Sequence, residues 1–381
     1  QFSNRKEVIH TMKLLCSKAE LKKSLNIVMK AVPAKTTMPI LECILIDAST
    51  NDIKFTSNDM ELGIETRVQG MVLEKGVIAL DAKIFSEIIR KLPDSDVTIE
   101  TDERLNTTIT CEKAKFNIPG KSGEDFAYLP LIEKNDCIRV SQFTLKEIIR
   151  QTIFSIALNE NNKLMTGELF QIEDNRLRVI SLDGHRISIR RVPLQEACEN
   201  RKVVVPGKTL SEISKILSGE LEDMVDIYLS SNHILFEFDD TTVVSRLIEG
   251  EYFKIDQMLS SDYETKVKIN KKEFLDCIDR ATLLVKEGDK KPIIINIEDG
   301  QMELSIDSQI GSMKEDIDIE KEGKDIMIGF NPKFLIDALK VIDDEEISIY
   351  LMNPKAPCFI RDDAQQYIYL ILPVNFNAVS R

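Results

Sequence analysis

The chain repeats one arrangement of helical and strand-like stretches three times along its 381 residues. A helical stretch follows a short alternating run in each third, at 18–30, 143–157 and 271–283. An aspartate closes a later strand-like run at Asp59, Asp183 and Asp307, which are 124 residues apart. A second helical stretch begins at Lys83, Lys208 and Lys333, which are 125 residues apart. Three features in one order at one spacing indicate duplicated domains, because a loose alternation of strands and helices does not keep such intervals.

The interval predicts three similar domains, at 12–137, 138–263 and 264–381. Units of this length are ordinary domains rather than short solenoid repeats. Stretches with period-2 alternation outnumber the helical ones, so we expect an α+β fold with two helices packed on antiparallel sheets in each domain. Residues 1–11 precede the first alternating run, and we expect a leader or tag remnant there, with a short native extension as the alternative.

Composition narrows the class of protein. The seven cysteines are scattered and never spaced C-x-x-C, which favours reduced thiols in the cytoplasm over a disulfide framework or a zinc ribbon. Tryptophan is absent and aromatic residues are only 6%, which disfavours a stacking platform for single-stranded nucleic acid. No apolar run approaches the roughly 18 residues that span a bilayer, so we expect no membrane partner.

Catalytic motifs are missing from the sequence. Gly120–Ser122 and Gly207–Thr209 end like a phosphate-binding loop, but Lys115 and Lys202 stand where its first glycine is required. The G-x-G-x-x-G, H-E-x-x-H and G-x-S-x-G patterns do not occur. We therefore expect a binding protein that is not an enzyme and holds no metal or cofactor. A hydrolase with paired carboxylates and a repeat-built scaffold protein remain the alternatives.

The four residues Asp183-Gly184-His185-Arg186 are the most pointed local motif. Asp and Gly favour a turn, which would leave His185 and Arg186 in solvent. The alternative is that the turn presents an exposed recognition patch.

These features together resemble the bacterial DNA sliding clamp, the beta subunit of DNA polymerase III. The resemblance rests on the repeat, on Lys35 and the Met38–Leu41 stretch, on the Asp183–Arg186 turn and on the ending Tyr369–Val374, and it covers residues 12–381. It implies a head-to-tail homodimer that forms a closed six-domain ring around duplex DNA, with the helices lining the hole and the sheets forming the outer wall. The ring would slide on DNA and act as a processivity factor.

The charge pattern fits this resemblance. The chain carries a net charge of −14, which by itself opposes binding to a polyanion. The six helical stretches nevertheless sum to +8. A basic lining in an acidic body would meet phosphates without reading bases, as a sliding protein requires. Solvated helix faces rich in lysine are the alternative.

The resemblance also implies a hydrophobic groove between the second and third domains, which would accept short Leu/Phe-containing peptides. The implied partners are the DNA polymerase III alpha subunit, the clamp loader, other polymerases and mismatch-repair proteins. The matching positions are Met165, Thr166, Leu182, Gly184, His185, Arg186, Ile187, Gln257, Met258, Pro357, Leu370, Leu372, Pro373, Val374 and Asn375. Apolar side chains would bury the peptide's anchors, while His185 and Arg186 would hold its polar groups. The family's F-P-D-Y is Tyr252-Phe253-Lys254-Ile255 here, so the rim is expected to differ.

Two further sets of residues follow from the resemblance. DNA contacts are expected at Lys35, Asn159, Lys163 and Lys208. The dimer seam would join the first domain of one copy to the third domain of the other, with Phe116 and Ile118 facing Leu283 and Leu284. A strand pair across that seam would remove two sheet edges.

Overall fold

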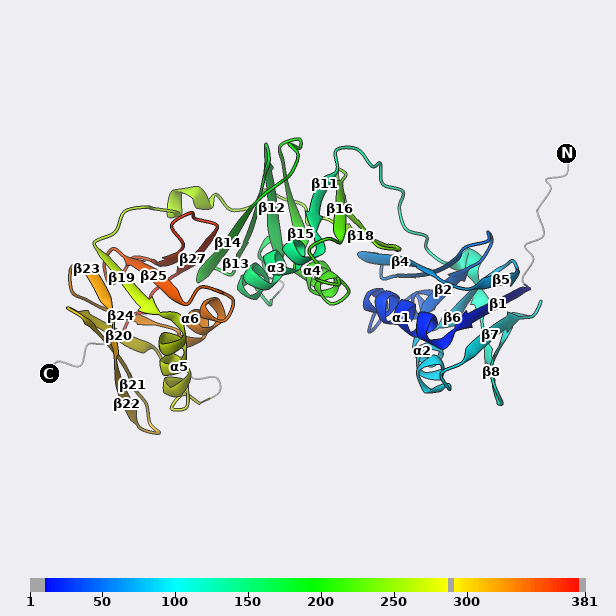
Figure 1. Cartoon of the computed structure of the whole chain (residues 1–381), viewed down its shortest axis with the longest axis horizontal. Helices are drawn as coiled ribbons and strands as arrows, with labels where there is room; N and C mark the ends of the chain where they lie inside the picture. Colours follow the sequence, from blue (N-terminus) through cyan, green and yellow to red (C-terminus); the bar gives the residue numbers. More distant parts are fainter. Residues whose placement is uncertain (1–10, 160, 287–290, 377–381) are drawn as a thin grey trace. The chain divides into compact units, whose positions relative to one another are not determined.

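The computed structural model describes residues 11–159, 161–286 and 291–376 (Figure 1). Residues 1–10 of the predicted leader lie outside this range. The chain forms two compact units, of which the first comprises residues up to 143 together with 215–247, and the second comprises 144–214 and 248 onward. The boundary between the units runs through the second repeat.

The first repeat contains α-helices, 3-10 helices (η) and strands. Its elements are β1 (Met12–Ser17), α1 (Lys18–Val28), η1 (Met29–Ala31), η2 (Pro39–Glu42), β2 (Cys43–Asp47), β3 (Ile53–Asn58), β4 (Leu62–Val68), β5 (Met71–Glu74), β6 (Val77–Asp81), α2 (Ala82–Lys91), β7 (Asp96–Thr101), β8 (Asn106–Cys111), β9 (Ala114–Pro119), β10 (Lys121–Ser122) and η3 (Gly123–Asp125).

The second and third repeats follow the same general order, although the second has no counterpart of β5 among its described residues. The second has β11 (Ile138–Ser141), α3 (Gln142–Thr152), η4 (Ile153–Ser155), η5 (Lys163–Thr166), β12 (Gly167–Glu173), β13 (Arg176–Leu182), β14 (Arg186–Pro193), β15 (Arg201–Pro206), α4 (Gly207–Ser214), β16 (Met224–Leu229), β17 (His233–Phe238), β18 (Thr241–Arg246) and η6 (Ile255–Met258). The third has β19 (Thr265–Asn270), α5 (Lys271–Thr282), β20 (Ile293–Glu298), β21 (Gln301–Asp307), β22 (Ser312–Asp318), β23 (Glu320–Gly323), β24 (Ile326–Phe330), α6 (Pro332–Leu339), β25 (Glu346–Leu351), β26 (Cys358–Arg361) and β27 (Tyr367–Ile371).

The observed elements confirm the α+β prediction and place two α-helices in each repeat. Two helices end earlier than the sequence predicts, because their last predicted turn is a 3-10 helix. At the end of α3, the Thr152 hydroxyl donates to the Ile148 carbonyl at 2.7 Å. A threonine that bonds back to the preceding turn bends a helix, which accounts for the change at this point.

Short polar residues make four strands run directly into helices. The Ser17 hydroxyl and the Asp81 carboxylate accept the N–H groups of Glu20 and Ile84, at 3.3 and 2.8 Å, and so cap α1 and α2. Asn270 and Asn331 cap α5 and α6 in the same way. Such caps satisfy donors that a helix leaves unpaired at its N-terminus.

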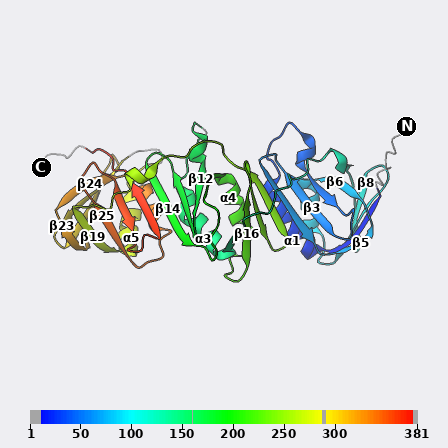
Figure 2. The ribbon, with the colours of Figure 1, turned by 90° about the horizontal axis from the view of Figure 1, so that it is seen from above.

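Each unit contains one nine-stranded antiparallel sheet that combines strands of two successive repeats. In the first unit, β4 of the first repeat pairs with β18 of the second, with Leu62 opposite Ser245. In the second unit, β14 of the second repeat pairs with β27 of the third, with Arg186 opposite Ile371. Figure 2 labels β12, β14, β25 and β19 along the second sheet. A five-stranded sheet (β5-β1-β7-β8-β9) completes the first unit and a four-stranded sheet (β22-β21-β20-β24) the second.

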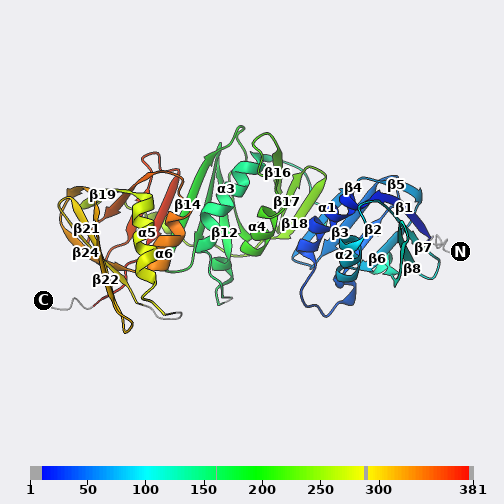
Figure 3. The same cartoon turned by 60° about the horizontal axis from the view of Figure 1, so that its bottom comes forward.

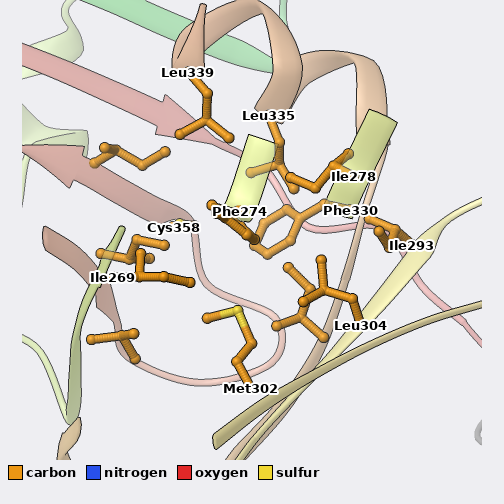
Figure 4. Close-up of a cluster of buried hydrophobic side chains, with 14 of the residues drawn as sticks. Ile269, Phe274, Ile278, Ile293, Met302, Leu304, Phe330, Leu335, Leu339 and Cys358 are labelled. Atoms are coloured by element: carbon orange, nitrogen blue, oxygen red, sulfur yellow. The ribbon is translucent and has the colours of Figure 1, made fainter. Parts of the chain in front are cut away.

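In the first and third repeats the two helices pack together. Figure 3 shows α1 beside α2 and α5 beside α6. In the third repeat the core includes Phe274 of α5, Met302 of β21 and Phe330 of β24, all almost fully buried (Figure 4). Burying a side chain of this size contributes roughly 2–3 kcal/mol.

The three spaced aspartates lie at equivalent hairpins. Asp59 follows β3, and its carboxylate accepts the N–H groups of Glu61 and Leu62 at 3.0 and 2.7 Å. Asp307 ends β21, but its hairpin closes through the Ser308 N–H, which donates to the Gly311 carbonyl at 3.0 Å. In the first two repeats the aspartate's own N–H closes the turn, to the Leu62 and Arg186 carbonyls at 3.0 and 3.4 Å, so Ser308 rather than Asp307 takes the aspartate's place in the third repeat.

Candidate peptide-binding site

An apolar pocket of about 270 Å³ lies in the second unit, against the β13–β14 hairpin. Its walls come from η5, the hairpin, the η6 segment and the end of β27. The lining residues are Met165, Leu182, Gly184, His185, Arg186, Ile187, Phe253, Lys254, Ile255, Met258, Leu370 and Leu372. Its volume is near the lower end of the range typical of small-ligand pockets and suits one or two anchoring side chains.

The Asp183–Arg186 motif forms the turn predicted from its sequence. Gly184 has a φ of 88°, a left-handed conformation that glycine adopts without steric penalty. The Asp183 carboxylate accepts the N–H groups of His185 and Arg186 at 3.0 and 3.2 Å. The Leu372 N–H donates to the His185 carbonyl at 2.9 Å. The hairpin and the C-terminal strand therefore hold each other in register at the pocket.

Arg186 does not point into solvent, contrary to the turn prediction's placement of its side chain. Its guanidinium contacts the carboxylates of Asp183 (3.0 Å) and Asp337 (2.6 Å) and the Phe154 carbonyl (2.7 Å). It also lies over the Phe334 ring, 4.5 Å from the ring centroid. Three of its five N–H donors bond protein acceptors and its side chain is 7% exposed, so Arg186 positions the hairpin and offers little for a peptide's polar groups. The ring of His185 stacks on Phe334, with a centroid separation of 5.9 Å.

The pocket floor is part of a buried apolar cluster of the second unit. Leu182, Ile187 and Leu370 are 5%, 5% and 1% exposed and cannot move freely. At the rim, Phe253 and Met258 are 37% and 45% exposed. Well-packed floors with exposed apolar rims are typical of sites that bury anchor residues.

Six of the predicted groove residues do not line this pocket. Thr166 closes η5, where its hydroxyl donates to the Lys163 carbonyl at 2.7 Å. Gln257 is exposed on η6, and Pro357 precedes β26. Pro373, Val374 and Asn375 follow β27. The Val374 N–H donates to the Gly329 carbonyl of β24 at 2.9 Å, so the chain leaves the pocket after Leu372.

Three lining residues, Phe253, Lys254 and Ile255, were not predicted. They occupy the stretch where the chain departs from the family's F-P-D-Y. Lys254 is 80% exposed, and its amino group lies 3.4 Å from the equally exposed Glu251 carboxylate. The only sequence signal for them was this departure itself, because a short irregular segment has no periodicity.

The residues expected to contact DNA are all exposed. Lys35 lies in the loop between η1 and η2 of the first unit. In the second unit, Asn159 precedes η5, Lys163 begins η5 and Lys208 lies in the first turn of α4. On α1, Leu21 and Leu25 are buried while Lys22 and Lys23 are exposed, so this helix presents positive charge away from its core.

The predicted seam residues lie at or near sheet edges. Phe116 and Ile118 are on β9, the edge strand of the five-stranded sheet, and Phe116 is 40% exposed. Leu283 is 78% exposed just after α5, whereas Leu284 packs on the core of the third repeat. In the second unit, β22 is the edge of the four-stranded sheet.

Among residues 11–159, 161–286 and 291–376, no cluster of three or more His, Cys, Asp or Glu side chains is arranged to hold a metal ion. No helix in this part of the chain has the length and apolar character needed to cross a membrane.

The matches to known proteins extend over all three repeats. Family models for the DNA polymerase III beta subunit match residues 12–130 (N-terminal domain), 139–254 (central domain) and 256–375 (C-terminal domain). The beta sliding clamps of Staphylococcus aureus and Staphylococcus epidermidis are each 36% identical over 361 residues, which is 92% of this chain and 96% of theirs.

Solved structures agree with the sequence comparison. A protein of Eubacterium rectale described as a DNA polymerase III beta subunit is 72% identical, with a TM-score of 0.94 over 96% of this chain and 100% of its own. The Bacillus subtilis sliding clamp is 35% identical, with a TM-score of 0.93 over 96% of this chain and 99% of its own. A Pseudomonas aeruginosa clamp solved with bound griselimycin shares the fold at 22% identity and a TM-score of 0.90.

Proposed function

Because the chain belongs to the DNA polymerase III beta subunit family, the bacterial sliding clamps, we propose that it is a processivity factor that acts as a homodimeric ring. The ring encircles duplex DNA, slides along it and tethers the replicative polymerase. The observation that carries this proposal is the presence of all three beta-subunit domains in one chain, since two such chains supply the six domains of a ring. The domain limits proposed are 12–137, 138–263 and 264–381, and residues 1–11 stand before the first domain.

The ring holds DNA by topology and not by sequence. The exposed lysines of α1, together with Lys35, Asn159, Lys163 and Lys208, meet phosphates, and such contacts carry no base information. The rest of the acidic chain repels DNA and keeps the duplex in the hole. The protein takes no part in catalysis, needs no cofactor and works at the nucleoid in the bacterial cytoplasm.

A topological assay tests the ring. The protein is loaded on a closed circular plasmid, washed at moderate salt, and the plasmid is then cut once. We expect the clamp to stay on the circle and to leave within minutes of linearisation, because only an open end lets a ring slide off. Equal retention on circular and linear DNA would refute the proposal.

The dimer seam is the pairing of β9 in one copy with β22 in the other. Both are edge strands, and antiparallel pairing of two edges joins the sheets and removes exposed backbone groups. Phe116 and Ile118 on β9 then lie near Leu283 and Leu284 across the seam.

The pocket in the second unit is the groove through which partners bind. Its apolar floor suits Leu- and Phe-containing peptides of the polymerase alpha subunit, the clamp loader, other polymerases and mismatch-repair proteins. The Leu182→Ala, Leu372→Ala double variant removes two walls and is expected to abolish binding of a Gln-Leu-x-Leu-Phe peptide. The dimer, measured by light scattering, stays intact. Glu196→Gln, an exposed change outside the groove, is the control, and unchanged peptide affinity in the double variant would show that the pocket is misplaced.

A further inference from the structure

A second pocket, of about 280 Å³, lies in the first unit against the β3–β4 hairpin. The elements around it repeat those of the groove: a hairpin, the segment that follows the domain, and the strand of the next repeat that pairs with the hairpin. Nine of the twelve groove-lining positions have a counterpart 124 or 126 residues earlier that lines this pocket. Leu182 corresponds to Asn58, Lys254 to Tyr128 and Leu370 to Val244.

The backbone of the two sites is the same in detail. In the groove the Leu372 N–H donates to the His185 carbonyl at 2.9 Å. At the equivalent positions the Arg246 N–H donates to the Glu61 carbonyl, also at 2.9 Å. The pairing of β18 with β4 places Val244 opposite Gly63, as β27 with β14 places Leu370 opposite Ile187.

The β3–β4 hairpin at the second pocket is held by hydrogen bonds of the Asn58 side chain. The Asn58 side chain donates to the Ala127 carbonyl at 3.0 Å and accepts the Met60 N–H at 2.8 Å. Met60 has a φ of 75°, at the position where the groove has Gly184. A non-glycine residue in this conformation costs about 1 kcal/mol or more, and such strain is concentrated at functional sites. Here it holds a flexible apolar side chain, 50% exposed, on the pocket rim.

None of the nine corresponding positions carries the same residue in both pockets, and two of the changes alter the space and the charge most directly. Gly63 replaces Ile187, and a Cβ built on it would lie 2.1 Å from the Leu129 side chain, so Leu129 fills that space. Arg246 replaces Leu372 and is exposed. Glu61 is the other charged residue of the lining, and no ion pair within 4.0 Å joins it to Arg246 in the described part of the chain. Burial and the neighbouring Arg246 lower the pKa of His233, so Arg246 is the cation of this pocket at neutral pH.

We propose that this second pocket binds an extended peptide that places an apolar side chain between Met60, Leu129 and Val244 and a carboxylate beside Arg246. Val244 and Arg246 are two residues apart on one strand, so their side chains share a face about 7 Å apart. A peptide in extended conformation presents residues i and i+2 with the same spacing. The preferred sequence is therefore an apolar residue and an acidic residue separated by one position, whereas the groove offers apolar Leu372 at the corresponding place.

Photo-crosslinking distinguishes the two sites in one experiment on the full-length dimer. The probe is Gly-Ser-X-Ser-Asp-Ser-Gly, in which X is photo-leucine, and its partner probe carries Asn in place of Asp. Labelled peptides are mapped by mass spectrometry. We expect residues 58–63 or 127–130 to be labelled several times more by the Asp probe than by the Asn probe. An exposed Arg–carboxylate contact is worth up to about fivefold in affinity.

Matched variants test the role of the guanidinium. Arg246→Leu, which gives the pocket the groove's residue, is expected to reduce labelling by the Asp probe to that of the Asn probe. Arg246→Lys keeps the charge and most of the preference, and Glu61→Gln increases labelling because it removes a repelling carboxylate. Arg246 is exposed, and melting curves check that each variant is folded.

Labelling of 182–187, and its loss on adding excess Gln-Leu-x-Leu-Phe peptide, reports separately on the groove. Absence of that signal counts against the proposed function and not against the second pocket. No labelling of 58–63 or 127–130 above that of other exposed segments, or labelling that Arg246→Leu leaves unchanged, would overturn the inference.

Discussion

Glu168 on β12 is a carboxyl group buried in the second unit, and replacing it with glutamine should stabilise the protein at neutral pH. Its side chain is 0% exposed, and neither carboxyl oxygen has a hydrogen-bond donor in the described structure. Burial raises the pKa of Glu168 from 4.5 to about 8, against an opposing effect of Thr152. The Thr152 hydroxyl already donates to the Ile148 carbonyl, so its proton is not available to a carboxylate. Tyr252 is the titratable side chain that faces Glu168.

The sign and size of the effect follow from linkage. The folded protein keeps the proton of Glu168 up to about pH 8, whereas the unfolded chain loses it above about 4.5. The stabilisation from this protonated group is therefore complete below pH 4.5 and is lost progressively as the pH rises toward 8. Each pH unit in that window changes the free energy of unfolding by about 1.4 kcal/mol. Glutamine mimics the protonated acid and does not titrate, so Glu168→Gln should be more stable by about 3 kcal/mol at pH 7, with little difference near pH 4.

Native-state hydrogen exchange is the suitable assay, because a three-domain chain does not unfold in one step. Amides of β12 and β13 should be protected about a hundredfold more in Glu168→Gln than in the parent at pH 7, and about equally at pH 4. Glu196→Gln, an exposed change in the same unit, should show no such gap. Lower protection of Glu168→Gln at pH 7 would refute the reasoning, since it would mean that an ionised carboxylate is held by a donor the structure does not show.

Three further changes test other parts of the structure. Phe116→Asp places a charge on the edge strand β9. It should shift the light-scattering mass at low micromolar concentration from that of a dimer to the 43.4 kDa of one chain. The control Leu131→Asp, which adds the same charge at another exposed apolar residue, should leave the mass of the dimer unchanged. Arg186→Lys cannot satisfy three partly buried acceptors and should destabilise the hairpin by about 2 kcal/mol, lowering the melting temperature and the affinity for groove peptides. Gly329→Ala puts a Cβ 2.6 Å from the Phe376 ring and should speed amide exchange after residue 372 by about fivefold without changing exchange in the hairpin.

The domain-scale pattern was the most predictable feature of the fold. Helices and strands recurred where the intervals of 124 and 125 residues placed them, because each repeat must bury the same faces of the same elements. Local geometry was less predictable. The turn at Asp183 was readable from its sequence, but the hairpin at Asp307 closes through Ser308. Asp307 lies one position before the residue that closes this turn, so an interval counted in residues misplaces the turn by one.

The pocket was predicted in part for a similar reason. Leu370 and Leu372 are two residues apart and both line the pocket. Because alternate residues of a strand lie on the same face, such positions can be predicted from sequence. Pro373 to Asn375 continue the same sequence, but a strand's periodicity holds only while the chain stays in the sheet, and here it turns away to β24. The burial of Arg186 by Asp337 depends on a contact 151 residues away, which no local pattern reports.

Duplication explains why a second pocket exists and why its chemistry differs. A hairpin, a linker and the paired strand of the next domain meet at both junctions, because equivalent strands pair at each. The backbone hydrogen bond from Arg246 to Glu61 is therefore equivalent to the one from Leu372 to His185. Side chains are free to diverge on this common backbone. A half-buried leucine at position 372 favours any apolar anchor, whereas an exposed arginine at position 246 adds a preference for one charge. One duplicated scaffold can therefore offer two sites of similar volume that do not compete for the same sequence.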